Sequence, residues 1–423
     1  MKLGLGGIGE AFRDDNFRRY SLGSILSWIS YFVQAVAVSW TTWELTHSTS
    51  WLAIIALLDA APNVALMPLG GVIADRFDRF RVMLLSYGFA WPQAVALTWL
   101  AWAGQLTIER LAALAFLHGA IHAFSIPAQY GFLPRFVERK RLSSAISVAA
   151  AYTQLAVFAG PALAGWLILH FGVVAAYASN VVGYGVFFAF VAFLRTPAGY
   201  VQPPASGKSF LGDFLEGLDA IRAHHGILAL LALMLMGAAL YQAIAQMAPA
   251  IADKNFGAGV EGLSTMLAAA GVGATIAALW LAHGGAARAA PAVILRAFCG
   301  FVVSVVALAS ARGLLVGAVA MLALGASWEI CRTGSFALAQ TSIQDGLRGR
   351  VMSTWFLILR GAGALGVVAT GAAADGWGLR TPLLAGAALA TRMGRHLFRS
   401  SADRRGVWRR VRATPRLRLG RNA

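Results

Sequence analysis

The sequence is a succession of apolar runs, each about 20 residues long, with short charged segments between them. An α-helix of about 20 residues crosses the ~30 Å hydrocarbon core of a bilayer. Because 58% of the 423 residues are hydrophobic and only 13% are charged, the chain lacks the polar surface of a water-soluble protein of this size. We therefore expect an all-helical membrane protein that crosses the bilayer many times.

The apolar runs fall into two groups separated by a polar linker. Complete spans are predicted near residues 20–43, 51–73, 82–103, 109–128, 146–169, 174–193, 227–250, 263–282, 290–310, 314–340 and 353–374. The organisation expected from them is a cytoplasmic N-terminus (1–19), an N-terminal six-helix bundle (20–193), a cytoplasmic linker (194–225), a C-terminal helix bundle (226–390) and an Arg-rich tail (391–423). The linker also predicts a short amphipathic helix on the membrane surface, from its apolar residues Phe210, Phe214, Leu215 and Leu218.

Basic residues lie mainly on one side of the predicted bundle. That side carries Arg13, Arg18, Arg19, Arg76, Arg79, Arg81, Arg135, Arg139, Lys140, Arg141, Lys208, Arg222, Arg288, Arg348 and Arg350, whereas the other side carries Arg110, Lys254, Arg312 and Arg380. The positive-inside rule therefore places the N-terminus and the linker in the cytoplasm. Contact with a membrane surface then also explains the formal charge of +17, so we expect membrane lipids and no nucleic acid as partners.

An internal repeat relates the two groups of spans. Three glycines recur with a single displacement of 206 residues, which carries Gly160, Gly165 and Gly172 onto Gly366, Gly371 and Gly378. In both copies a basic loop precedes the small-residue helix and a glycine closes it. This pattern predicts a duplication with two parallel halves.

The stretch "GGVIADRFDRFRV" places five charges directly after an apolar span. It resembles the Gly-x-x-x-Asp-Arg-x-Gly-Arg-Arg signature of the major facilitator superfamily, with Gly71, Asp75, Arg76 and Arg79 at matching positions and Asp78 in place of the second glycine. Together with "PAQYGFLPRFVERKRLSSAIS", "GPALAGWL" and "LRGRVMS", it resembles the branch that contains the enterobactin exporter and bacterial drug-efflux proteins. The resemblance extends over residues 12–390.

The resemblance implies the major-facilitator fold, two six-helix bundles in the bacterial inner membrane. It also implies that the charged loop is a latch that holds the two halves together on the cytoplasmic side. Gly71 would then allow close helix packing, and Asp75 would accept hydrogen bonds from a neighbouring helix N-terminus. Arg76 and Arg79 would bind carboxylates or lipid phosphates. The alternative is that the loop only anchors the chain by the positive-inside rule.

Polar residues inside spans are candidates for function because their burial in a membrane is costly. The resemblance implies that spans 1, 4, 7 and 10 surround a central cavity, and polar residues on those spans include Gln34, His118, His122, Gln242, Glu329 and Arg332. Glu329 and Arg332 are three residues apart and share one helical face. They are either a static pair that neutralises itself, or a proton or cationic-substrate site that Arg332 gates.

Asp59 and the two histidines form a second group of candidates. Asp59 is expected ~12 Å below the external end of span 2 by helical rise, either at a water-accessible bend or paired with Arg360 of span 11. His118 and His122 are one helical turn apart. They are either packing residues or a proton relay.

Gly160, Pro161 and Gly165, in "FAGPALAGW", resemble the Gly-Pro motif that the superfamily carries on helix 5 of antiporters. We expect the two glycines to pack closely against the other half. This motif favours export by proton exchange. The Arg expected within span 4 is absent, because Arg110 lies at its entrance and residues 111–117 are apolar, so proton coupling is left open.

The resemblance stops after Ala390. The ten residues "TPLLAGAALA" are too short to cross the bilayer, so the twelfth helix is expected to be short, interfacial or absent. The Arg-rich segment beyond them is either a tether for anionic lipid or nucleic acid, or a degenerate terminus.

These features predict a secondary transporter and no enzyme. We expect export of a small amphipathic molecule, a drug or a siderophore, by alternating access with protons as coupling ion. The alternatives are an importer or symporter, and an inactive scaffold. No full Gly-x-x-x-x-Gly-Lys-Ser/Thr loop for ATP is present, Cys299 and Cys331 lie in apolar segments, and we expect no cofactor, no metal and a monomer.

Overall fold

The computed structural model describes residues 15–132, 142–193, 210–284, 290–343 and 345–403. All regular secondary structure in these residues is helical. The helices are α2 (Asp15–Thr46), α3 (Thr49–Arg76), α4 (Arg79–Trp102), α5 (Ile108–Phe132), α6 (Leu142–Ala192), α7 (Phe210–Ala223), α8 (His225–Ala250), a π-helical turn η2 (Ile251–Asn255), α9 (Gly259–Gly284), α10 (Pro291–Ser310), α11 (Leu314–Ser342), α12 (Asp345–Trp377) and α13 (Arg380–Asp403).

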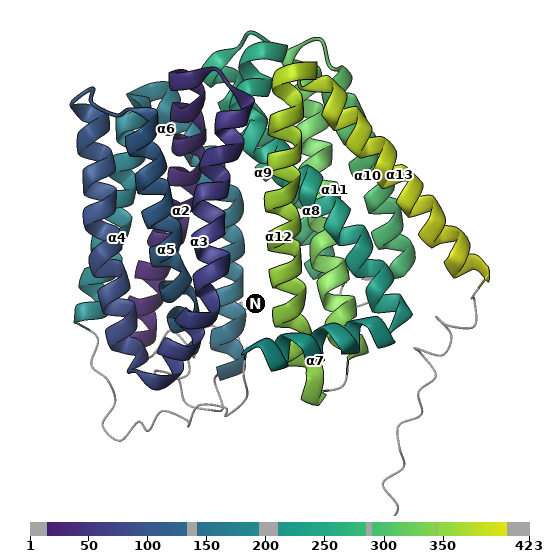
Figure 1. Ribbon diagram of the computed structural model, residues 1–423, viewed down its shortest axis with the longest axis horizontal. Helices are drawn as coiled ribbons and strands as arrows, with labels where there is room; N and C mark the ends of the chain where they lie inside the picture. The colour runs from purple at the N-terminus through teal and green to yellow at the C-terminus, as the bar shows by residue number, and fades with distance from the viewer. Residues whose placement is uncertain (1–14, 133–141, 194–209, 285–289, 344, 404–423) are drawn as a thin grey trace, which may run out of the picture.

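The long helices form two bundles side by side, α2 to α6 and α8 to α13 (Figure 1). Nine of the described helices are long and apolar enough to cross a membrane. One of them, α6, contains two passes because the chain turns sharply at Gly172, whose φ of 78° lies in the left-handed region that glycine tolerates. The predicted major-facilitator fold of two six-helix bundles is confirmed.

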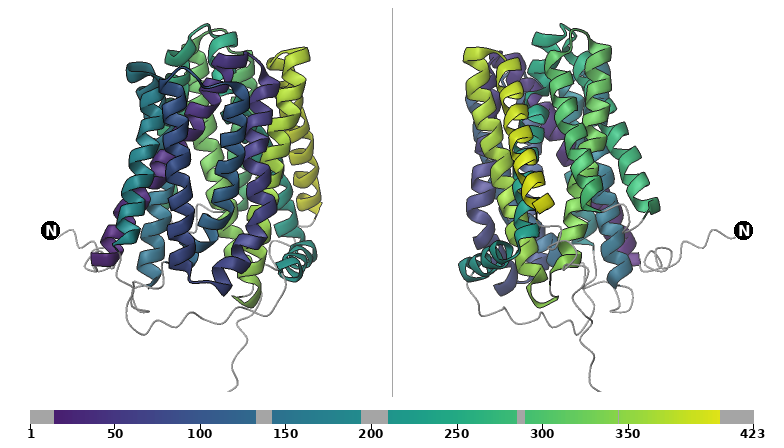
Figure 2. Two further views of the ribbon diagram at one scale, coloured as in Figure 1. Left: turned by 60° about the vertical axis from the view of Figure 1, so that its left-hand side comes forward. Right: turned by 90° about the vertical axis from the view of Figure 1, so that its right-hand side faces the viewer.

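Throughout, the upper end of the molecule is the end that carries the turn between α2 and α3, and the lower end is the one that carries α7, as in Figure 1. α7 lies across the lower end of the C-terminal bundle (Figures 1 and 2). Gly217 permits this contact, because an added Cβ would lie 2.7 Å from the carbonyl oxygen of Arg350 in α12. An ion pair between Glu216 and Arg350 joins the same two helices. The predicted linker helix is present and is attached to α12.

Gly160 and its counterpart Gly366 make equivalent contacts in the two bundles. A Cβ added at Gly160 of α6 would lie 2.4 Å from Cβ of Phe32 in α2, and one added at Gly366 of α12 would lie 2.4 Å from the carbonyl oxygen of Ala239 in α8. Each glycine therefore packs on the first helix of its own bundle. The expectation that Gly160 contacts the other half is wrong.

Gly165 and its counterpart Gly371 lie at contacts between the two bundles. A Cβ added at Gly165 of α6 would lie 2.6 Å from Cα of Ser264 in α9, and one added at Gly371 of α12 would lie 2.6 Å from Cβ of Ala53 in α3. Each glycine thus packs on the second helix of the opposite bundle, as predicted for Gly165. Equivalent glycines of the two bundles therefore make equivalent contacts, which supports the duplication predicted from the sequence.

The last helix, α13, is unusual in composition and not in length. Its 24 residues are helical from Arg380 to Asp403, so the expected truncation is not found in the described part. Leu383, Ala387 and Ala390 are buried against the C-terminal bundle. Beyond Thr391 the helix is rich in arginine and extends away from α12 at its lower end (Figure 1), and α13 is not among the helices apolar enough to cross a membrane.

Candidate functional site between and within the bundles

The first of two contacts between the bundles at the upper end is made by a single carboxylate. Oδ1 of Asp375, near the end of α12, accepts hydrogen bonds from the backbone N and the Oγ1 of Thr49, at 2.8 and 2.6 Å. Oδ2 of Asp375 accepts from Oγ of Ser48 and backbone N of Ser50, at 2.8 and 3.0 Å. The first amides of a helix lack intrahelical acceptors and carry partial positive charge, so an anion is favoured there.

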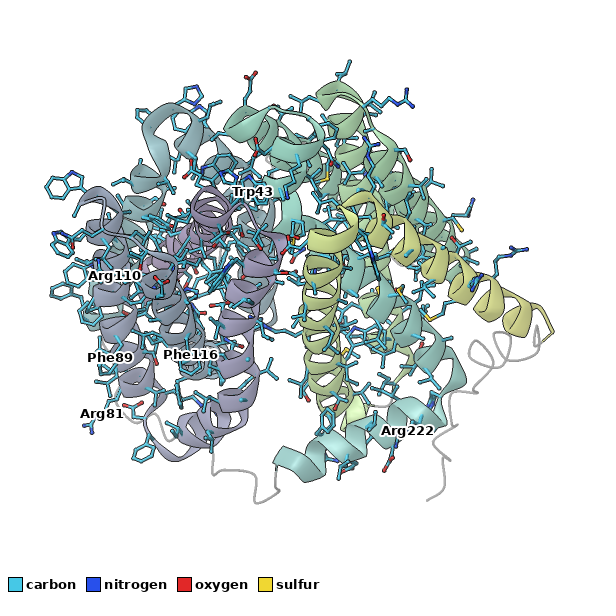
Figure 3. All side chains as sticks on the ribbon, turned by 45° about the horizontal axis from the view of Figure 1, so that its top comes forward. Trp43, Arg81, Phe89, Arg110, Phe116 and Arg222 are labelled. Carbon is cyan, nitrogen blue, oxygen red and sulfur yellow. The ribbon has the colours of Figure 1, made fainter. Side chains whose placement is uncertain are left out.

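A second contact at the upper end lies beside the first. Nε1 of Trp43 in α2 donates to Oδ2 of Asp253 in η2 at 3.0 Å, and Nζ of Lys254 lies 4.9 Å from the Trp43 ring centroid. Figure 3 shows Trp43 where the two bundles meet. Sequence reasoning missed Asp253 and Asp375. The one available signal was the Ser-Thr-Ser run at residues 48–50, which is typical of a helix N-terminus.

At mid-height, Glu329 lies between the two bundles and is 2% exposed. The Nη2 of Arg332 donates to Oε2 of Glu329 at 2.6 Å, so the pair predicted from their spacing is formed. Oε1 of Glu329 accepts from the hydroxyl of Thr333 and, at 3.4 Å, from Nε2 of Gln154 in α6 of the other bundle. Arg332 retains a side-chain exposure of 33%.

Aromatic rings adjoin this pair. Tyr241 of α8 and Trp328 of α11 are stacked, with centroids 5.1 Å apart and planes inclined by 14°. Gly237 makes room for the indole, since an added Cβ would lie 2.6 Å from Cζ3 of Trp328. Gln242, one residue beyond Tyr241, is exposed. The charged pair thus lies beside two stacked aromatic rings, of which Trp328 is buried and Tyr241 is partly exposed.

Asp59 is paired with His118 and not with Arg360. Oδ1 of Asp59 lies 2.7 Å from Nδ1 of His118. Gly119 allows this approach between α3 and α5, because an added Cβ would lie 1.9 Å from the carbonyl oxygen of Asp59. Arg360 is exposed on α12 and interacts electrostatically with Tyr31 of α2. The alternative that pairs Asp59 with Arg360 is therefore wrong.

A chain of hydrogen bonds continues from His118 through the interior of the N-terminal bundle. Nε2 of His118 and Nε2 of His122 lie 3.3 and 3.0 Å from the hydroxyl oxygen of Tyr184 in α6. Nδ1 of His122 lies 3.2 Å from Oγ of Ser125. The two predicted histidines are thus connected, but through Tyr184, which sequence reasoning missed because it belongs to a distant span.

A pocket adjoins Asp59 inside the N-terminal bundle. It encloses about 560 Å³, including its open mouth. Leucine, isoleucine, alanine and valine side chains form much of its wall, and its polar lining residues are Tyr31, Gln34, Ser39, Thr42, Asp59, Gln93, His118 and Gln246. The structure therefore brings three of the predicted residues, Gln34, Asp59 and His118, to one cavity.

The charged loop below the N-terminal bundle connects α3 to α4. Asp78 is the N-cap of α4, with its Oδ1 accepting from the backbone N of Phe80 at 3.1 Å. A cap explains an acid where the family signature has glycine. Arg79 is the first residue of α4. The side chains of Asp75 and Arg76 lie outside the described part of the structure, so the latch remains a prediction.

Close packing near this loop occurs at Gly70 and not at Gly71. A Cβ added at Gly71 would meet nothing within 4 Å, whereas one added at Gly70 would lie 2.1 Å from the carbonyl oxygen of Ala123 in α5. The expectation for Gly71 is wrong, since neighbouring helical residues point about 100° apart. Within the described residues, no three His, Cys, Asp or Glu side chains are grouped to hold a metal ion.

Comparisons with known proteins agree with this architecture. The chain matches the transmembrane secretion effector family over residues 10–402. It is 27% identical over 388 residues to the enterobactin exporter EntS of Shigella boydii serotype 4 (strain Sb227), covering 86% of this chain and 89% of that protein. It is 26% identical to EntS of Escherichia coli O139:H28 (strain E24377A / ETEC), with the same coverage.

Two solved structures share the fold. A bacterial homologue of the human lysosomal transporter Spinster, inward-facing and unoccupied, superposes with a TM-score of 0.69 at 15% identity over 92% of this chain and 97% of that one. The nucleoside transporter NupG gives a TM-score of 0.68 at 12% identity, over 90% and 98% of the two chains. From its two bundles, its internal repeat and these matches, the chain belongs to the transmembrane secretion effector family of major facilitator transporters.

Proposed function

We propose that this transporter exports a small amphipathic molecule, a drug or a siderophore, across the bacterial inner membrane in exchange for protons. The alternating access of two bundles moves the substrate. The N-terminus and the lower end face the cytoplasm, in line with the excess of Lys and Arg in the loops of that side. The relatives described as enterobactin exporters support the outward direction.

The observation that carries the proposal is the buried Glu329, which contacts Arg332 on its own helix and Gln154 on the opposite bundle. A hydrogen bond that crosses between bundles must break when the bundles rotate. Protonation of Glu329 removes the charge that holds Arg332. A cationic substrate group that displaces Arg332 competes with that proton for one carboxylate, which is the exchange that an antiporter requires.

The contacts at the upper end define the first step of export. Asp375 and Trp43 hold the bundles together there, away from the side that we assign to the cytoplasm. Substrate then enters from the lower end, and its apolar part packs on the Tyr241–Trp328 stack. Arg360 and Gln242, both exposed on helices of the C-terminal bundle, are further substrate contacts in this proposal.

The test uses inverted vesicles that contain the purified chain and an acidic lumen. Siderophores and lipophilic drugs are added one at a time, and proton release and substrate uptake are recorded together. We expect both in the wild type and at least a 100-fold loss in Glu329→Gln. Glu261→Gln, an exposed acid in the first turn of α9, is the matched control and retains activity.

Each outcome decides a different part of the proposal. Full activity of Glu329→Gln excludes Glu329 as the coupling group. Substrate uptake without proton release excludes antiport and retains export. Substrate movement in the opposite direction favours the importer or symporter, and an inserted wild-type protein that transports nothing from the panel favours the inactive scaffold.

A further inference from the structure

The pocket beside Asp59 lies within one bundle, between α2, α3, α4 and α5, with only Gln246 contributed by α8. It is separate from the Glu329 pair on α11. Its polar residues therefore need their own explanation, because a buried polar group without a partner is destabilising.

Two amide oxygens in this pocket have no partner in the structure. Gln93 is 3% exposed, and its Nε2 donates to the carbonyl oxygen of Leu114 at 3.3 Å, while its Oε1 is buried and unpaired. Gln34 is also 3% exposed, with its Oε1 buried and unpaired. Both side chains line the pocket next to Asp59.

Hydroxyl groups in the wall add to the same chemistry. Oγ1 of Thr42 donates to the carbonyl oxygen of Val38 at 2.7 Å, and Oγ of Ser39 lies 2.7 Å from Oε1 of Gln246 and 3.0 Å from the carbonyl oxygen of Ala35. Once each hydroxyl has donated its single proton to one of these acceptors, it offers only lone pairs to the pocket.

The hydrogen bonds of the adjoining network are compatible with an ionised Asp59 beside a neutral His118, and a protonated His118 would instead form an ion pair with Asp59. Ser125 can donate to Nδ1 of His122, Nε2–H of His122 to Tyr184, the Tyr184 hydroxyl to Nε2 of His118, and Nδ1–H of His118 to Asp59, over 3.2, 3.0, 3.3 and 2.7 Å. Every bond in this chain is satisfied with both histidines neutral.

Within the part of the chain that the structure describes, His118 pairs with Asp59, and no arginine or lysine forms an ion pair with it. The side chain of Asp59 is 32% exposed, and the described residues include no ion pair between Asp59 and Arg360. Arg360 instead interacts electrostatically with Tyr31 and His122. A carboxylate inside a membrane protein requires a compensating cation or a proton.

We propose that this pocket binds one small monovalent cation, either Na⁺ or a hydronium ion, with the Asp59 carboxylate as counter-charge and the amide oxygens of Gln34 and Gln93 as neutral ligands. Carboxylate, carbonyl and hydroxyl oxygens are the ligands of hard cations. A single acid matches a single positive charge. Binding at this site does not depend on the export that we propose at Glu329.

The experiment measures cation binding directly on the full-length protein in nanodiscs. Equilibrium binding of ²²Na⁺ at pH 8, with choline as the replacement cation, detects the sodium form. Proton uptake on acidification from pH 8 to pH 5, compared between wild type and Asp59→Asn, detects the hydronium form. We expect about one site per chain by one of the two readouts, and its loss in Asp59→Asn.

Two further variants separate ligands from folding. Gln93→Met and Gln34→Met keep similar side-chain size but remove the amide oxygen, and each is expected to weaken cation affinity at least 10-fold while the protein remains folded. Glu109→Gln, an acid in the first turn of α5, is the matched control and leaves binding unchanged.

The result that overturns the proposal is a folded wild type with neither saturable Na⁺ binding at 100 mM nor proton uptake that depends on Asp59. Unchanged affinity in both glutamine variants also overturns it. Glu329→Gln retains cation binding, so failure of transport at Glu329 and failure of this site are distinguished.

Discussion

The two bundles share a framework of glycines and differ in what they bury. Of the described residues, 17 buried polar or charged side chains belong to the N-terminal bundle and five to the C-terminal bundle. Histidine, glutamine and asparagine are all among the 17, whereas Glu329 is the one ionisable side chain among the five. The two halves thus share the close contacts that let helices approach, and they differ in their interior chemistry.

The largest expected effect concerns the upper end, where the repeat is broken. Asp375 has Leu169 at its counterpart position 206 residues earlier, so only one bundle supplies a carboxylate to the other. Asp375→Asn removes the charge from an acceptor of four hydrogen bonds, and charged hydrogen bonds contribute about 1.5–3 kcal/mol each. We expect at least a 10-fold shift toward molecules open at the upper end, measured by spin-label distances across it.

Asp253→Asn is the matched variant for Asp375→Asn, because in the described residues the carboxylate of Asp253 accepts one hydrogen bond, from Trp43. We expect it to cause a smaller shift toward molecules open at the upper end. If both variants leave the distance distribution unchanged, the upper contacts do not control opening.

An intermediate effect is expected at the equivalent glycines. Gly160→Ala and Gly366→Ala each place a methyl group against a neighbouring helix, and overpacking of this kind costs about 1–3 kcal/mol. Gly361→Ala, where an added Cβ meets nothing within 4 Å, is instead expected to stabilise by about 0.5–1 kcal/mol. Thermal unfolding in detergent measures all three, and unequal losses at Gly160 and Gly366 argue against structural equivalence of the halves.

The smallest effect compares a tyrosine in each bundle. Tyr184→Phe removes the hydroxyl between His118 and His122, and is expected to destabilise the protein by about 1–2 kcal/mol. Tyr241→Phe preserves the stack on Trp328 and is expected to change stability by less than about 0.5 kcal/mol. Chemical unfolding of the two variants tests the difference, and similar losses contradict an unequal use of polar contacts.

Local sequence patterns were sufficient to predict the fold and part of the candidate site. Span length and charge distribution predicted the helices, and an i,i+3 spacing predicted the contact of Glu329 with Arg332. The partner of Asp59 was not predictable in this way. Pairing it with His118 depends on the relative rotation of α3 and α5, which Gly119 fixes through a contact between distant parts of the chain.

Rotation about a helix axis also explains the error at Gly71. Gly70 and Gly71 are adjacent in sequence, but only Gly70 faces α5. The roles of Asp375 and Tyr184 could not be predicted for a related reason, since each side chain forms hydrogen bonds with residues on helices far away in sequence. Helical periodicity describes one helix at a time, and these contacts depend on how separate helices are placed against each other.

The attachment of α7 to α12 has a mechanical consequence. Because Glu216 pairs with Arg350 and the backbones approach closely at Gly217, we expect α7 to move together with the C-terminal bundle. A rocking motion of that bundle would then carry α7 with it. A fluorophore on the solvent-facing side of α7 would report this motion during the transport cycle without any label inside the membrane.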